Sequence, residues 1–326
     1  MTCLLSFIMT VALFIASKNT LTAAIVTSWL ESGNSISEVW CENDSSLLQT
    51  PRGLSGKVFP QFDTVRVLRN AGIKVRAVPP LHKWNEASEA ALATGAEVLV
   101  SALTLQWIPM SLIELFPGKA VNFHPALLPR YRGPGPIAGM LIDGAADESG
   151  GVTLHLLTEG FDEGPVIAQI ACPRSEARDF FDWYFQIATA AGQLAGTELP
   201  AYLRGERQLQ PQNHAEASYR RMKDGEIDLG SHMMLREIEH RFSAFGPHHA
   251  HRWICSNGDK YAVTGVVRVL GERANKPDRR RLLSLDVDLA DLRVRLRMRT
   301  PVSQALLASA RLSAMNRATR RSATKP

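Results

Sequence analysis

Short apolar runs rich in β-branched residues alternate with helical patterns through the first half of the chain. Alternation of this kind is typical of βαβ units, in which helices cover both faces of a mostly parallel sheet. Strands are predicted near residues 10–16, 36–41, 73–78, 97–101 and 119–124, with helices between them at 21–31, 62–70, 86–94 and 109–115. The sequence therefore predicts an α/β fold with a doubly wound, mostly parallel sheet.

A smaller second domain is expected after this region. Two further strands near 152–157 and 166–170 and a long helix over 177–203 complete the first domain, and the polar segment that follows is typical of a linker. The predicted organisation is a catalytic domain over 9–203, a linker over 204–217, a smaller β-rich C-terminal domain over 218–300 and a basic tail over 301–326.

The formal net charge of +5 is concentrated at the end of the chain. From Arg268 onward there are 15 Lys or Arg against 5 Asp or Glu, whereas the preceding residues hold 22 against 27. A basic end attracts polyanions such as RNA or acidic membranes, but it is also typical of a solvated, partly disordered terminus. Charge alone leaves both interpretations open.

No segment has the ~20 consecutive apolar residues that span a bilayer. The nearest, Cys3 to Ala16, has no basic residues ahead of it, so a buried first strand is expected rather than a signal peptide. A strand that begins after Met9 leaves residues 1–8 as an extension or a mis-assigned start. The four cysteines form no C-x-x-C pair. We therefore expect a reduced, cytoplasmic protein with no membrane partner.

A doubly wound sheet first suggests a dinucleotide site, but the glycine-rich fingerprint is missing. Ser17-Lys18-Asn19 after the first strand has no glycine to bring backbone amides onto a pyrophosphate. The other glycine cluster, Gly133-Pro134-Gly135-Pro136, has the wrong spacing, and its prolines remove amide donors. Nicotinamide or flavin binding is therefore poorly supported.

The stretch 120–133 contains residues suited to catalysis. Asn122 and His124 lie two apart on a predicted strand, so they share one face and end at the carboxyl edge of the sheet, where α/β proteins place ligands. An amide that holds a developing oxyanion beside an imidazole that exchanges a proton suits acyl transfer. A satisfied histidine at a strand end is the alternative interpretation.

Asp162 lies in a turn between two strands of the same region, with Gly160 and Gly164 on either side. A carboxylate presented there can reach His124 and a water. Taken alone, an aspartate between glycines is usually a turn-forming residue.

The order of these motifs resembles that of the folate-dependent formyltransferase family, and most of all its methionyl-tRNA formyltransferase-like members. The resemblance covers roughly residues 95–172 and rests on Asn122-x-His124, Leu127-Leu128-Pro129-x-Tyr131-Arg132-Gly133, Gly151-Val152-Thr153 and Gly160-Phe161-Asp162-Glu163-Gly164-Pro165. It implies a formyltransferase-type fold, 10-formyltetrahydrofolate as formyl donor, an amine acceptor, and Asn122, His124 and Asp162 as the catalytic residues.

The same resemblance implies the donor-binding residues. Donor binding is expected at Leu105, Gln106, Trp107, Gly160 and Phe161, although Leu105 and Trp107 could instead cap the core. Acceptor binding is expected at Arg52, Lys57 and Arg132, where a basic side chain suits either a tRNA phosphate or a sugar diphosphate.

Initiator methionyl-tRNA is the favoured acceptor, because residues 217–247 resemble the entry to the second domain of tRNA and sugar formyltransferases and the chain has a basic end. N-formylation of a nucleotide-linked amino sugar is the alternative. A catalytically inactive RNA-binding protein is the non-enzymatic alternative. No metal is expected, because His248, His249 and His251 diverge along a strand with no fourth ligand nearby.

Overall fold

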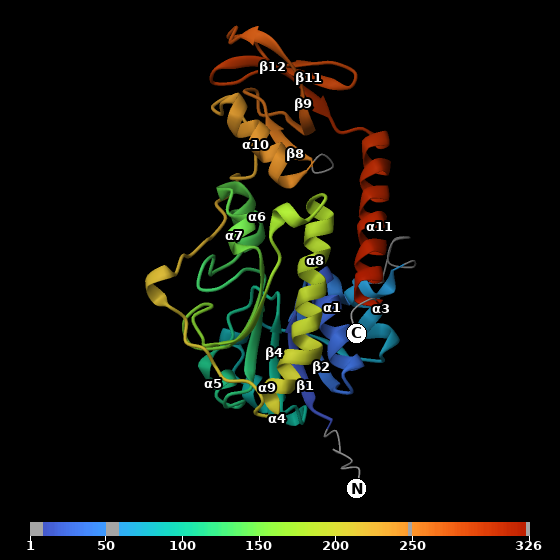
Figure 1. Ribbon diagram of the computed structural model, residues 1–326, viewed down its shortest axis with the longest axis vertical. Helices are drawn as coiled ribbons and strands as arrows, with labels where there is room; N and C mark the ends of the chain where they lie inside the picture. Colours follow the sequence, from blue (N-terminus) through green and yellow to red (C-terminus); the bar gives the residue numbers. More distant parts are fainter. Residues whose placement is uncertain (1–8, 50–58, 247–249, 324–326) are drawn as a thin grey trace.

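The computed structural model describes residues 9–49, 59–246 and 250–323. Its larger part is a seven-stranded sheet with the strand order β3-β2-β1-β4-β5-β6-β7 (Figure 1). The first five strands pair in parallel, whereas β6 runs antiparallel to β5 and β7 antiparallel to β6. The strands are β1 Val11–Ala16, β2 Ser35–Glu42, β3 Val75–Val78, β4 Val98–Ala102, β5 Ala120–His124, β6 Gly151–Leu156 and β7 Val166–Ala171. The predicted doubly wound, mostly parallel sheet is confirmed.

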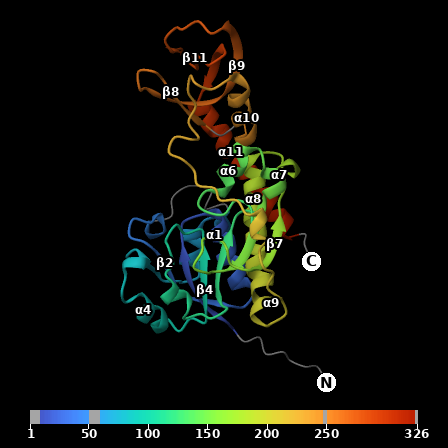
Figure 2. The same ribbon diagram turned by 90° about the vertical axis from the view of Figure 1, so that its left-hand side faces the viewer.

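Helices cover both faces of this sheet. Along β1, Phe14 packs on the face covered by α1 and α8, and Leu13 and Ile15 pack on the face covered by α4 and α5. Figure 2 shows the sheet from the side. The helices of this part are α1 Thr20–Glu31, α3 Thr64–Asn70, α4 Ala87–Ala93, α5 Met110–Ile113, α6 Pro136–Asp143, α7 Ala146–Ser149, α8 Phe180–Gln193 and α9 Leu199–Leu203. Because helices cover both faces of the sheet, its strands carry apolar side chains on both sides.

The long helix predicted over 177–203 is in fact α8, a π-helical turn over Leu194–Glu198, and α9. It begins after Asp179, whose side chain caps the first turn by accepting from the Asp182 amide at 2.9 Å. Gly196 lets this helix approach α1, because a Cβ there would come within 3.0 Å of the Ser28 carbonyl oxygen.

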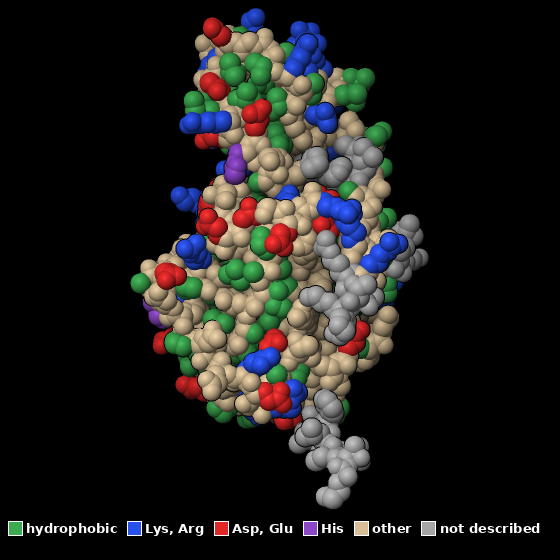
Figure 3. Space-filling view, in the orientation of Figure 1, with side chains coloured by type: hydrophobic (Ala, Val, Ile, Leu, Met, Phe, Trp, Pro, Cys, Tyr) green, Lys and Arg blue, Asp and Glu red, His purple; other side chains and the backbone are tan. Residues whose placement is uncertain are grey.

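The smaller C-terminal domain holds a five-stranded antiparallel sheet in the order β10-β11-β12-β9-β8, packed on helix α10. Figure 3 shows Lys and Arg side chains on the surface of this domain. Its elements are α10 Leu235–Phe245, β8 His251–Ile254, β9 Lys260–Glu272, β10 Arg279–Arg280, β11 Ser284–Asp288 and β12 Leu292–Met298. A β-rich second domain is confirmed, although its exact boundaries stay a prediction.

Residues 301–323 lie in the predicted basic tail and form a helix, α11 Pro301–Ala323, that returns to the catalytic domain and packs along α8 (Figure 1). Its buried side chains Ala314 and Met315 cover Phe62 and Phe185. A count of charges gives no sign of this, since it does not register the apolar residues Leu312 and Met315 that lie between the arginines of α11. Among the described residues, no helix is both long enough and apolar enough to cross a membrane.

Candidate active site

Asn122 and His124 lie at the carboxyl end of β5, as predicted. β5 runs between β4 and β6 in the middle of the sheet, and alternate side chains of a strand share one face. The His124 side chain is buried, and its Nε2 donates to the Tyr131 carbonyl oxygen at 2.8 Å. A carbonyl only accepts, so the hydrogen of the neutral His124 ring is on Nε2 and its Nδ1 carries a lone pair.

Asp162 comes from the turn between β6 and β7. Gly164 makes this turn possible, because a Cβ there would lie 1.9 Å from the Leu156 carbonyl oxygen. Asp162 itself has a φ of 55°, in the left-handed region that non-glycine residues seldom adopt. Its Oδ2 accepts from the Gly133 amide at 2.8 Å, and its Oδ1 accepts from Asn122 Nδ2 at 3.2 Å. The turn thus places a carboxylate against the end of β5.

The three predicted catalytic side chains therefore meet in one cluster. His124 Nδ1 lies 3.4 Å from Asp162 Oδ2, and Asn122 bonds Asp162 directly. The catalytic role of each residue stays a prediction, but the alternative that Asp162 only forms a turn does not account for these side-chain contacts.

His155 is a fourth member of the cluster, and sequence reasoning missed it. It lies on β6 directly opposite Asn122 and is almost fully buried. Its Nδ1 donates to the Leu156 carbonyl oxygen at 2.8 Å, so its Nε2 can accept from Asn122 Nδ2 at 3.1 Å. The available signal was the period of two along β6, which pairs Thr153 with His124 and His155 with Asn122.

Both hydrogens of the Asn122 side-chain amide are therefore used in hydrogen bonds, one to His155 and one to Asp162. The sequence led us to expect an amide free to hold an oxyanion. In the structure Asn122 must release one of its two bonds before it can donate to a substrate oxygen.

Burial and neighbouring groups shift the pKa values of His124 and Asp162. Burial lowers the pKa of His124, and the nearby Asp162 charge only partly offsets this. Burial acts to raise the pKa of Asp162, but His124, His155 and the Gly133 amide outweigh it and hold that pKa well below its ordinary value. Near neutral pH the cluster therefore holds a carboxylate beside a neutral imidazole, a pair that can accept one proton.

The residues predicted to bind the donor only partly converge. Trp107, in the loop after β4, and Phe161, in the Asp162 turn, lie edge to face with ring centroids 5.7 Å apart. Both rings are about half exposed and Leu105 is 79% exposed, so Leu105 and Trp107 do not cap the core. The Gln106 side chain, unlike those of Leu105 and Trp107, makes a structural contact. Its Oε1 accepts from the Leu81 amide at 3.1 Å and so joins two loops.

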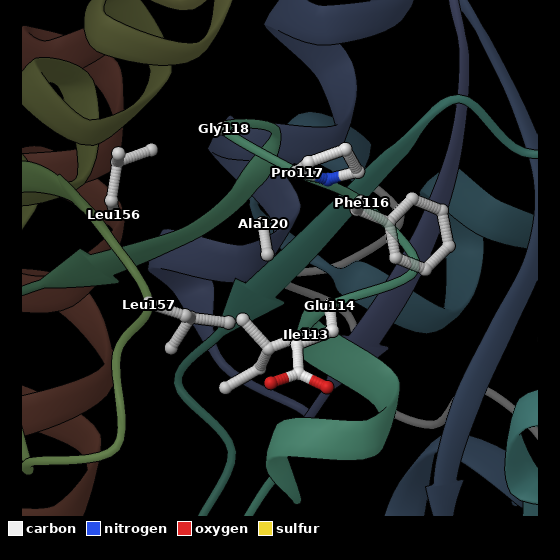
Figure 4. Close-up of a pocket in the computed structure, with 8 residues that line it drawn as sticks. All are labelled: Ile113, Glu114, Phe116, Pro117, Gly118, Ala120, Leu156 and Leu157. Atoms are coloured by element: carbon white, nitrogen blue, oxygen red, sulfur yellow. The ribbon is translucent and has the colours of Figure 1, made fainter.

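A pocket of about 230 Å³ opens between α5 and the start of β5 (Figure 4). Ala120, one of its lining residues, shares a face of β5 with Asn122. The pocket is lined by Ile113, Glu114, Phe116, Pro117, Gly118, Ala120, Leu156 and Leu157. Its lining is mainly apolar with one carboxylate, Glu114, and does not include Asn122, His124 or Asp162.

A second pocket, of about 280 Å³, lies on the Asp162 turn and is lined by Arg132, Phe161, Glu163, Ala217, Ser218 and Tyr219. Arg132, a predicted acceptor residue, is buried and pairs with Glu163 at 3.3 Å. Arg52 and Lys57, the other two, lie outside the described residues.

The segment predicted as a linker forms part of this region. Gln210 pairs with Val166 through two backbone hydrogen bonds of 2.8 Å, and the Gln212 side chain is buried against the Asp162 turn. Residues 204–217 do connect the two domains, but they do not run free in solvent.

No group of three His, Cys, Asp or Glu side chains in the described part of the chain could hold a metal ion. His251 instead packs edge to face against the rings of Phe242 and Phe245. His248 and His249 lie outside the residues that the structure describes.

Comparisons with known proteins show which family this chain resembles. The family model described as "Formyl transferase" matches residues 9–193, more than half of the chain. A methionyl-tRNA formyltransferase of Herpetosiphon aurantiacus is 35% identical over 39% of this chain and 41% of its own length. One from Chloroflexus aurantiacus is 36% identical over 46% of this chain and 48% of its own. The chain thus spans about half the length of these curated relatives.

The fold agrees as well. An N-formyltransferase of Helicobacter canadensis, solved with folinic acid and dTDP-3-aminofucose, superposes with a TM-score of 0.55 at 16% identity, over 90% of this chain and all of that one. At this identity the likeness concerns the fold alone. The extent of the family match shows that the chain belongs to the formyl transferase family.

Proposed function

We propose that this chain transfers a formyl group from 10-formyltetrahydrofolate to an amine, with initiator methionyl-tRNA as the favoured acceptor. The observation that carries the proposal is the cluster of Asn122, His124 and Asp162 at the carboxyl edge of β5. Membership of the formyl transferase family supports the reaction type.

The cluster offers what formyl transfer needs. The amine nitrogen bonds to the formyl carbon, the bond from that carbon to the folate nitrogen breaks, and one proton passes from the amine to the departing nitrogen. Asn122 stabilises negative charge on the formyl oxygen once one of its amide hydrogens is released from His155 or Asp162. His124 accepts the proton at Nδ1, directly or through water, and Asp162 stabilises the resulting imidazolium before the proton moves on.

The surroundings of the cluster fit a flat, partly polar donor. The Trp107 and Phe161 rings are exposed beside the Asp162 turn, and the pocket between α5 and β5 is largely apolar with one carboxylate, Glu114. Aromatic and apolar surface would hold a pteridine ring, and Glu114 would accept hydrogen bonds from its amino groups.

The acceptor choice rests on more general features. The curated relatives are named methionyl-tRNA formyltransferases, and the C-terminal domain adds basic surface that suits a polyanion. A nucleotide-linked amino sugar is the alternative, since Arg132 in the second pocket could serve a diphosphate.

The test is a formyl-transfer assay with 10-formyltetrahydrofolate, offering methionyl initiator tRNA and a panel of nucleotide-linked amino sugars in parallel. We expect formylated methionyl-tRNA. If only an amino sugar is formylated, the acceptor is a nucleotide-linked amino sugar rather than methionyl-tRNA. RNA binding without turnover on any acceptor would favour an inactive RNA-binding protein and overturn the proposal.

A further inference from the structure

The linker segment (residues 204–217) lies along the Asp162 turn and joins it to a second loop. Gln210 pairs with Val166, just after the turn. Beyond the segment, the Ser218 carbonyl oxygen accepts from the Arg132 amide at 2.8 Å, and the Arg132 carbonyl oxygen accepts from the Arg220 amide at 2.7 Å. Figure 1 shows this part of the chain passing from α9 to the C-terminal domain.

Gln212 makes four side-chain hydrogen bonds from this segment. Its Nε2 donates to the carbonyl oxygens of Asp162 at 2.8 Å and of Gly164 at 2.7 Å. Its Oε1 accepts from Arg132 Nε at 3.2 Å and Nη2 at 2.8 Å. Carbonyls only accept and a guanidinium only donates, so these partners fix the orientation of the amide. Gln212 is 8% exposed, and every polar position of its side chain is used.

Arg132 extends the network to the other side of Asp162. Its guanidinium also contacts Glu163 at 3.3 Å and His214 Nδ1 at 3.3 Å. The next residue, Gly133, donates its amide to the Asp162 carboxylate. Gly133 has a φ of 91°, and a Cβ there would meet the Tyr219 ring at 2.6 Å, so glycine allows the loop and the chain after the linker to meet.

Asp162 is thus held at two points. Gly133 and Asn122 bond the carboxylate, and Gln212 bonds the backbone of the turn. A left-handed aspartate costs on the order of 1–3 kcal/mol and persists only where its surroundings over-determine it. Among the hydrogen bonds described, Gln212 is the side chain that links the Asp162 and Gly164 carbonyls.

We propose that Gln212 is a positioning residue that fixes the backbone of the catalytic turn, so that the Asp162 carboxylate stays against His124. The inference rests on the proposed formyl transfer for its kinetic consequence. Its structural consequence does not depend on that activity, because displacement of Asp162 would change the environment of His124 whatever reaction the protein performs.

Three variants separate the contributions. Gln212→Met keeps the approximate volume and removes all four hydrogen bonds. Gln212→Glu keeps an acceptor for Arg132 but cannot donate to the two carbonyls. Gln210→Met is the matched control, since the Gln210 side chain is exposed and the pairing with Val166 uses only its backbone.

We expect Gln212→Met and Gln212→Glu to lower kcat by roughly 10- to 100-fold, the range that a displacement of about 1 Å at a reacting group produces. The KM values for donor and acceptor should change less than threefold, because neither substrate contacts Gln212 in this account. Gln210→Met should behave as the wild type. Gln212→Glu with full activity would show that the donation to the turn is unimportant.

The second readout is an NMR titration of His124 in the full-length protein without substrates. Three groups face this ring: the Asp162 carboxylate, the His155 ring and the Tyr131 carbonyl oxygen. In Gln212→Met the pKa of His124 should fall below the wild-type value, because the carboxylate that raises it moves away. Unchanged titration and unchanged kcat in a folded Gln212→Met protein would overturn the inference while leaving formyl transfer intact. A wild type that transfers no formyl group would instead refute the proposed function, and the titration would still decide the role of Gln212.

Discussion

His124 Nδ1 lies 3.4 Å from Asp162 Oδ2, although one residue ends a strand and the other occupies a distant turn. The Nε2 hydrogen of the same ring is held by the Tyr131 carbonyl oxygen, so the Nδ1 lone pair faces the carboxylate. The Nδ1 lone pair and the Asp162 carboxylate repel each other while His124 is neutral. Once Nδ1 is protonated, His124 and Asp162 form an ion pair. The geometry therefore favours proton uptake during the reaction over a permanently charged histidine.

The first prediction concerns pH and stability. Burial lowers the pKa of His124 below its usual 6.5, so the unfolded chain binds a proton at a pH where the folded protein does not. The stability contributed by neutral His124 is therefore present above pH 6.5 and is lost as the pH falls below it. The depressed pKa of Asp162 adds a further loss below about pH 4. Tm measured from pH 8 to pH 5 should fall more steeply in the wild type than in His124→Asn. Equal slopes would contradict the assignment.

The second prediction concerns His155. His155→Phe removes the acceptor that holds one Asn122 amide hydrogen. The substitution also frees that hydrogen, but it leaves Asp162 as the remaining described partner of the Asn122 Nδ2 group. We expect the loss of orientation to outweigh this gain, so that kcat falls about fivefold, corresponding to about 1 kcal/mol, with little change in the KM for the donor. His82→Phe is the control, because His82 is exposed on the short 3₁₀ helix Leu81–Lys83. A His155→Phe enzyme as active as this control would show that Asn122 does not need the contact.

The third prediction concerns the exposed aromatic pair. Trp107→Ala and Phe161→Ala should each raise the KM for 10-formyltetrahydrofolate about tenfold, because a stacked aromatic contact contributes about 0.5–1.5 kcal/mol beyond its buried area. Donor binding should also quench Trp107 fluorescence. Leu92→Ala, an exposed leucine of α4, is the control. An unchanged donor KM in both aromatic variants would place the donor elsewhere.

The fourth prediction concerns α11. Arg317 Nε contacts the Asp182 carboxylate at 2.9 Å, and Asp182 is 1% exposed. Arg317→Met should lower the free energy of unfolding by about 2 kcal/mol, since it removes a charge-assisted hydrogen bond to a buried carboxylate. Urea denaturation measures this change, with Arg311→Met, at an exposed arginine of the same helix, as the control. Equal stability of the two variants would mean that α11 is not anchored through Arg317.

Deletion of residues 301–326 should lower the free energy of unfolding by more than Arg317→Met does, because the deletion uncovers Phe62 and Phe185.

Local patterns predicted the sheet and placed Asn122 beside His124, whereas Asp162 was joined to them by the resemblance to a known family. Strand periodicity aligned Asn122 with His124, and the glycines around Asp162 marked its turn. His155 was missed because the period of two along β6 identifies it only once the pairing of β6 with β5 is known. Gln212 was missed because a polar segment between domains has the composition of a free linker, whereas its burial depends on partners far away in the sequence.

The α11 helix shows the same limit. Its arginines left open whether the segment is ordered, and only the tertiary fold shows that Ala314 and Met315 meet aromatic residues of the catalytic domain. The contact of Gln106 with the Leu81 amide could not be predicted either, since it depends on two loops that meet only in the folded protein.

The most direct test of the account is single-turnover formyl transfer by the wild type and by Asp162→Asn, using 10-formyltetrahydrofolate and methionyl initiator tRNA. This substitution keeps the size of the side chain and removes the charge that stabilises a protonated His124. Circular dichroism should confirm that the variant is folded. We predict formyl transfer by the wild type and a decrease of ~100-fold or more in the variant, because His124 can no longer take up the proton efficiently without the Asp162 charge. A folded Asp162→Asn enzyme that transfers the formyl group within twofold of the wild-type rate would contradict the central claim.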